Sequence, residues 1–230
     1  MNLIKINKVK IALFAFSAIL LSSCSISKEL TENQKIIRNN NLYVNDELTP
    51  KDTLNNLFLQ KKNSTLIGIP IGALIYSSSK DNTDSIFDNW ASQKNKRSKL
   101  NTIFSKKQVN QLKKYYRSFN EWKKNNGEKI EIIDSSKTLA TVKNLNSYFQ
   151  NIGFLENKIV TEIKSNPDNE KYADVDYMVN TGPQYYIGDV SSVIESAVID
   201  SIYQQNTNKS FIKKNESFKT KNFALERERL

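Results

Sequence analysis

The chain has no histidine, one cysteine, six glycines and four prolines in 230 residues. Without histidine it lacks the commonest general base, the commonest metal ligand and every nucleophile that needs a histidine partner. A single cysteine excludes an internal disulfide and any cysteine-rich zinc site. The composition therefore favours a binding or structural protein over an enzyme. We expect no catalytic residue, no metal site and no cofactor.

Two clusters of acids are the remaining candidates for metal binding or acid–base chemistry. They are Asp81, Asp84 and Asp88, and the pair Asp168 and Glu170. Neither has the internal glycine and the closing glutamate of a calcium-binding loop. We therefore expect both clusters to be solvated acids in loops.

The first 24 residues have the pattern of an export signal. Three lysines within residues 1–10 precede the apolar run Ile11–Leu21, which is too short to span a bilayer. The segment Leu21–Cys24 then resembles the lipobox of bacterial lipoproteins. That resemblance implies a signal peptide of residues 1–23, acylation of Cys24 and anchoring of the protein to a membrane by lipid. A plain signal peptide with an incidental cysteine is the alternative.

Positive charge is concentrated in one stretch of the chain. The chain carries 34 basic and 24 acidic residues, and removal of residues 1–23 leaves 31 basic ones and a net charge of +7. Residues 91–127 hold eleven basic residues and one acid, Glu121. The stretch predicts either an anionic partner or the solvated face of a helix. For an exported protein we expect no nucleic acid, and the candidate contacts to an anionic partner are Lys106, Lys107, Lys113, Lys114, Arg117, Lys123 and Lys124.

Periodicity predicts helices in the middle of the chain. Residues 86–126 are expected to be helical, with a capping box over Ser105–Gln108 and a C-cap at Gly127. Apolar residues recur there every three to four positions, which predicts a face packed in the core. These residues are Val109, Leu112, Tyr116, Phe119 and Trp122.

Extended segments are predicted on both sides of this region. Before it we expect extended chain over 34–44, a helix that begins at Thr49 with Leu54, Leu57 and Phe58 on its apolar face, and a strand over 66–76.

After the basic region we expect a short strand over 128–134 and a helix capped by Ser135 or Ser136 that ends at Gly153. Strands then follow over 158–164 and 172–179, and residues 184–190 extend again. In the strand 172–179 the apolar residues alternate, which predicts one buried face. They are Ala173, Val175, Tyr177 and Val179.

Several segments together resemble POTRA domains of the BamA/TamA family in the Omp85 superfamily. The segments Gly127–Ile130, Tyr148–Phe154 and Tyr177–Ile187 resemble the entry strand, the helix-to-strand junction and the last strand of one unit. Gln60–Asn63 and Ile75–Tyr76 resemble the first unit of a lipid-anchored, TamA-like branch. Lys62 and Lys129 stand where the family usually has proline. Ser217–Phe218 and Leu225–Leu230 resemble the helix of a further unit.

The resemblance implies an α+β fold of tandem POTRA-like units, each with the order strand, helix, helix, strand, strand. After a lipidated tether (24–32), the expected units are 33–126 with a basic helical insertion, 127–181, and an incomplete 182–230. The family carries a C-terminal membrane β-barrel after these units, so we expect the chain to be an N-terminal fragment or a truncated gene product.

The implied function is that of a periplasmic scaffold in outer-membrane protein assembly or translocation. Its partners would be unfolded outer-membrane proteins or a TamB-like periplasmic protein, and its location the outer membrane. In POTRA domains the second strand lies at the sheet edge, where it can bind a client strand. The corresponding residues are Lys158, Ile159, Val160, Thr161, Glu162, Ile163 and Lys164. The alternative is a free-standing envelope lipoprotein whose basic helix binds anionic lipid or lipopolysaccharide.

Overall fold

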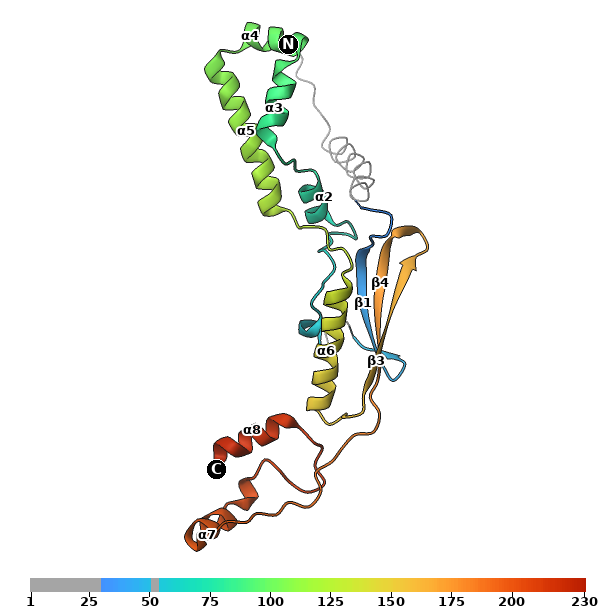
Figure 1. The fold of residues 1–230 in the computed structure, drawn as a ribbon, viewed down its shortest axis with the longest axis vertical. Coiled ribbons are helices and arrows are strands. Elements are labelled where there is room, and N and C mark those ends of the chain that lie inside the picture. Colours follow the sequence, from blue (N-terminus) through green and yellow to red (C-terminus); the bar gives the residue numbers. More distant parts are fainter. Residues whose placement is uncertain (1–29, 51–53) are drawn as a thin grey trace, which may run out of the picture. The chain divides into compact units, whose positions relative to one another are not determined.

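A computed structural model describes residues 30–50 and 54–230 (Figure 1). The predicted signal peptide, Cys24 and most of the tether lie outside these ranges. The fold is α+β, as predicted. The described helices are α2 (Ile71–Ser77), α3 (Thr83–Ser92), α4 (Lys94–Ile103), α5 (Lys106–Asn126), α6 (Ser135–Asn151), α7 (Ala197–Gln205) and α8 (Thr220–Arg229). The described strands are β1 (Ile36–Val44), β2 (Glu47–Leu48), β3 (Lys158–Asn166) and β4 (Asn169–Asn180).

Contacts along the backbone divide the described chain into two units. The first comprises residues 30–38, 62–132 and 168–172, and the second comprises 39–61, 133–167 and 173–230. Within the described ranges, none of the helices has both the length and the apolar character needed to cross a bilayer.

A four-stranded sheet with the order β2-β1-β4-β3 organises the second unit, and α6 lies beside it (Figure 1). The side chains of Asn39 and Asn41 on β1 donate hydrogen bonds to Asp174 and Asp176 on β4. Residue numbers rise together along the two strands, so β1 and β4 run in parallel. The strand predicted over 34–44 therefore joins the sheet of the strands predicted over 158–164 and 172–179.

The alternation predicted for β4 is confirmed. Ala173, Val175, Tyr177 and Val179 are all buried, and so are Leu145 and Phe149 of α6. The ring of Tyr177 meets that of Phe58 edge-on, with centroids 5.2 Å apart. Burial raises the pKa of the Tyr177 hydroxyl, and hydrogen bonds to Thr141 and Thr138 of α6 oppose that rise. The core of this unit therefore lies between α6 and β4.

Helices α2 to α5 make up most of the first unit. The capping box predicted at Ser105 is present, because the Ser105 hydroxyl accepts from the Gln108 N–H and the Gln108 side chain accepts from the Ser105 N–H. Phe87 of α3 packs on Tyr116 of α5, with ring centroids 6.1 Å apart. At the other end of α5, Gly127 is the C-cap, as predicted.

Several local predictions were wrong. The segment 66–76 is not a strand, because α2 begins at Ile71 after a turn closed by a bridge between Leu66 and Ile69. The expected strand 128–134 is reduced to a single bridge from Ile132 to Ile36. In the same way, the extended segment 184–190 makes only a bridge from Tyr186 to Ser217.

Two helix starts also differ from prediction. The helix expected from Thr49 is absent from the described residues there, which contain only a single 3-10 turn over Asn55–Leu57. Helix α6 is capped by Asp134, whose carboxylate accepts hydrogen bonds from the N–H groups of Ser136 and Lys137. The hydrogen bond from the Ser136 hydroxyl, followed by these backbone bonds, holds the pKa of Asp134 below its ordinary value.

Candidate binding surfaces

The strand predicted as a client-binding edge is β3, and it lies at one end of the sheet. In the part of the chain that the structure describes, no strand pairs with its outer side. Two apolar side chains of this strand are solvent-accessible, with Val160 61% exposed and Ile163 46% exposed. A strand of nine residues thus presents unpaired backbone groups together with apolar side chains.

The opposite edge of the sheet is covered along β1. Within the first unit the Ile37 N–H donates to the Glu131 carbonyl at 3.0 Å. Within the second unit the Thr49 N–H donates to the Leu42 carbonyl at 2.7 Å, and β2 pairs with the end of β1. These contacts occupy backbone N–H and C=O groups of β1 that would otherwise be exposed at the edge. The contrast singles out β3 as the open edge.

Charged side chains hold β3 against the rest of the sheet. The Lys164 ammonium lies 2.8 Å from the Asp176 carboxylate of β4 and 3.4 Å from the Glu162 carboxylate. The hydrogen bond to Asp176, followed by that to Glu162, raises the pKa of Lys164 above its ordinary value. The pairing ties Lys164 of β3 to the buried Asp176 of β4.

The seven basic residues predicted to form an anionic-partner patch all lie on α5. Three of them instead pair with acids of the same unit. Lys113 pairs with Asp88 at 2.6 Å, Arg117 pairs with Asp84 at 3.2 Å, and Lys124 pairs with Asp81. The hydrogen bond from Lys124 lowers the pKa of Asp81, and Asp81 raises that of Lys124.

The interpretation of these acids as solvated loop residues was therefore wrong in part. Asp84 and Asp88 lie on α3, and all three acids face basic residues of α5. A spacing of four residues places Asp84 and Asp88 on one helical face, a signal that was present in the sequence. Among the described residues, no group of three or more His, Cys, Asp or Glu side chains is arranged to hold a metal ion.

The remaining basic residues of the patch differ in their surroundings. Lys123 donates to the Ser78 carbonyl at 3.1 Å and lies 4.7 Å from the centre of the Phe119 ring. Lys106, Lys107 and Lys114 make no ion pair within the described ranges. The patch is thus split between residues that hold α5 to its neighbours and residues that face solvent.

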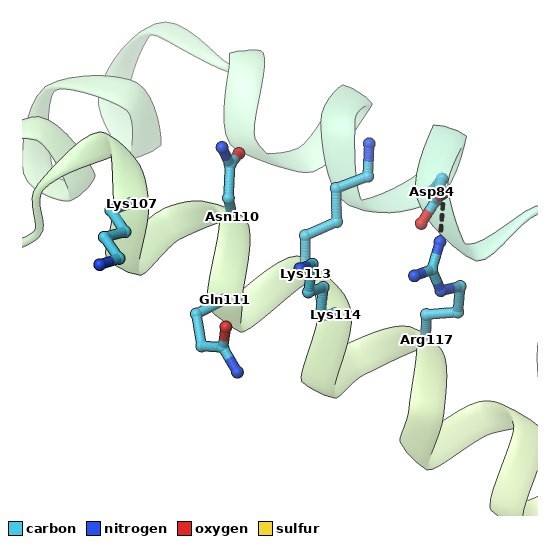
Figure 2. Close-up of a pocket in the computed structure, with 7 residues that line it drawn as sticks. All are labelled: Asp84, Lys107, Asn110, Gln111, Lys113, Lys114 and Arg117. Atoms are coloured by element: carbon cyan, nitrogen blue, oxygen red, sulfur yellow. Dashed lines mark hydrogen bonds and ion pairs between the residues drawn. The ribbon is translucent and has the colours of Figure 1, made fainter.

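An open pocket of about 600 Å³ lies along α5 beside α3 (Figure 2). In Figure 2 Lys113 points toward α3, whereas Gln111 points away from it. The pocket combines four cations with one carboxylate and two amides, so its electrostatic character is basic. Its lining residues are Asp84, Lys107, Asn110, Gln111, Lys113, Lys114 and Arg117.

The predicted apolar stripe of α5 is only partly buried. Val109, Leu112 and Tyr116 are half-buried, but Phe119 is 55% exposed and Trp122 is 49% exposed. Tyr115, which the stripe did not include, is 64% exposed. The prediction of a core face was therefore wrong for Phe119 and Trp122, because α2 and α3 cover only one side of a helix of 21 residues.

Comparison with known proteins assigns a function to neither surface. The chain matches no family model, no curated protein and no solved structure. The β3 edge and α5 are therefore the features of the chain that bear on its function.

Proposed function

We propose that the protein is a polypeptide-binding scaffold of the cell envelope and that β3 receives an extended segment of a client chain. The observation that carries this proposal is the open edge of β3, in a sheet whose opposite side is already covered along β1. Backbone N–H and C=O groups on such an edge recognise any strand-forming peptide with little regard for its sequence. This suits a protein that handles many unfolded clients.

The resemblance to POTRA domains supports the same proposal. A POTRA-like unit is expected to carry its second strand at the sheet edge, and β3 is the strand that follows α6 and occupies an edge. In this proposal β1, α6, β3 and β4 belong to one such unit, and the helices α2 to α5 are an insertion within it. The clients would be unfolded outer-membrane proteins, or a TamB-like protein, and Cys24 would carry the lipid.

Proline substitutions on β3 test the proposal. Along an edge strand, alternate N–H groups point to the neighbouring strand and to the open side. Of Val160→Pro and Thr161→Pro, one therefore removes a bond to β4 and the other removes a donor offered to the client. The second variant should keep the stability of the wild type and lose most of its affinity for the client.

The measurement is an NMR titration of the full chain with an alternating strand peptide from an outer-membrane protein. We expect shifts in β3 for the wild type and for only one of the two proline variants at equal peptide concentration. Shifts confined to α5, with 158–166 silent, would overturn the edge-strand proposal. Equal binding by the wild type and both variants would overturn it as well.

A further inference from the structure

The outer face of α5 carries aromatic side chains that no part of the described chain buries. Tyr115, Phe119 and Trp122 follow one another at intervals of four and three residues, which places them on one side of the helix. All three are about half exposed or more. The rings of Phe119 and Trp122 are stacked, with centroids 5.9 Å apart and planes 3° from parallel. We call these three residues the aromatic face.

Lysines flank the aromatic face on both sides. At 100° per residue, Lys107 and Lys114 lie roughly 80–100° to one side of Tyr115, and Lys123 lies about 80° to the other. Lys123 also lies over the Phe119 ring, and Lys107 and Lys114 line the open pocket. The aromatic groups are thus bordered by ammonium groups along much of the helix.

Asp81, Asp84, Asp88 and Glu121 make their ion pairs with residues other than these lysines. Asp81, Asp84 and Asp88 are engaged by Lys124, Arg117 and Lys113 on the opposite side of α5. Glu121, the one acid in residues 91–127, lies 4.0 Å from Arg117. The ion pairs between the helices therefore leave Lys107 and Lys114, which flank the aromatic face, without an ion pair among the described residues.

We propose that the aromatic face and its flanking lysines form a docking surface for a lipid bilayer rich in anionic phospholipid. Tyrosine and tryptophan favour the headgroup region of a bilayer, where the ring is buried and the polar atom stays wet. A helix with a basic border and an aromatic face binds in the plane of the membrane interface. Each lysine near an anionic surface adds attraction to lipid phosphates.

This surface is separate from β3 and does not depend on the edge-strand proposal. Charge complementarity selects the occupant, because the border of the aromatic face is basic on both sides. A neutral bilayer would bury the rings and leave Lys107 and Lys114 without anionic partners. An anionic bilayer satisfies both at once.

The test uses Trp122 as a reporter in the full chain with Trp90→Phe, because the protein has only two tryptophans. The chain is incorporated into vesicles of phosphatidylcholine, or of phosphatidylcholine mixed with phosphatidylglycerol, each with brominated acyl chains. Any lipid anchor is present in both samples. We expect blue-shifted and quenched Trp122 emission only in the phosphatidylglycerol vesicles, and reversal of both effects by high salt.

The variant Lys107→Glu/Lys114→Glu should lower the ratio of membrane-engaged to free helix by at least about tenfold. Lys213→Glu/Lys221→Glu makes the same change in net charge in the second unit and should leave the quenching unchanged. Equal quenching in both lipids, or no quenching in either, would overturn the proposal; the second result would leave the face to a protein partner. Binding of the strand peptide to β3 should persist in every variant.

Discussion

Lys164 on the edge strand and Asp176 on its neighbour form a salt bridge of 2.8 Å in which the lysine is half exposed and the carboxylate is only 2% exposed. The same carboxylate accepts a hydrogen bond of 2.7 Å from Asn41 on β1. Asp176 thus connects three adjacent strands, β1, β4 and β3, through its two oxygens. The open edge is tied to the centre of the sheet at this point.

Removal of the Asp176 carboxylate should therefore weaken the sheet. We expect Asp176→Ala to lower the free energy of unfolding by about 1–3 kcal/mol, because Asn41 loses its partner in a buried site. Glu162→Ala removes the more distant and more exposed carboxylate from Lys164 and should change little. Urea titrations followed by the NMR signals of β4 measure both. Equal midpoints for the two variants would contradict the linking role of Asp176.

Gly127 is predicted to be essential for packing at the end of α5. A Cβ atom at this position would lie 2.6 Å from both the Lys123 carbonyl oxygen and the Tyr76 backbone nitrogen. Gly127→Ala should therefore cost about 1–3 kcal/mol by overpacking. Gly188→Ala meets open space and should change stability by less than about 1 kcal/mol. Both tryptophans lie in the first unit, so their fluorescence during a urea titration reports its unfolding. Similar unfolding midpoints for the wild type and Gly127→Ala would contradict the prediction.

The ion pairs between α3 and α5 should make the first unit sensitive to salt. Replacing Asp81, Asp84 and Asp88 by asparagine should lower its unfolding midpoint at about 0.01 M ionic strength, and the difference should shrink at about 1 M because screening is then complete within a few ångströms. Tryptophan fluorescence in urea measures it. The matched control, Asp46→Asn/Glu195→Gln/Glu228→Gln, changes the net charge equally in the second unit. A loss of stability that does not depend on salt would refute the electrostatic cause.

Glu226 should make the C-terminal helix sensitive to acid. Hydrogen bonds from Arg229, and then from the Phe211 N–H and Ser210, lower the pKa of Glu226 from 4.5 to about 2. A carboxyl group with a lowered pKa contributes stability above its ordinary pKa, and that contribution is lost as the pH falls toward the lowered value. We expect the protection of the segment 210–229 to fall between pH 4.5 and 2.

The variant Glu226→Gln should remove most of this pH dependence, whereas Glu228→Gln on the exposed side of the same helix should retain it. Chemical shifts of the Phe211 amide, which donates to Glu226 at 2.8 Å, follow the transition directly. The same pH profile in wild type and Glu226→Gln would show that another group is responsible.

Local patterns predicted much of this fold because their causes are local. The capping box at Ser105 and the alternation of Val175 and Tyr177 depend on a few adjacent residues, and both were found. The apolar segment 66–76 was misassigned because a short apolar run fits a strand and a helix equally well. Asp134, Ser135 and Ser136 are all good caps, so sequence alone did not separate them.

Long-range relationships were beyond the reach of these patterns. The predicted stripe through Phe119 and Trp122 assumed that something covers it, and only the packing of α3 and α2 on α5 reveals which side stays open. Likewise, the three aspartates near residue 84 resemble a solvated cluster until α5 is placed opposite them. For β3, the strand was predicted from its sequence and its edge position from a family resemblance.

The parallel pairing of β1 with β4 has a consequence for how the chain reaches its fold. Asn41 and Asp176 are 135 residues apart in sequence, and closing a loop of that length costs about 4 kcal/mol of chain entropy before any contact compensates for it. The polypeptide is synthesised from its N-terminus, so β1 is made well before β4. The helices between the two strands can fold in that interval. During synthesis, β1 can pair with β2 early, but it gains its partner β4 only after residues 169–180 have been made.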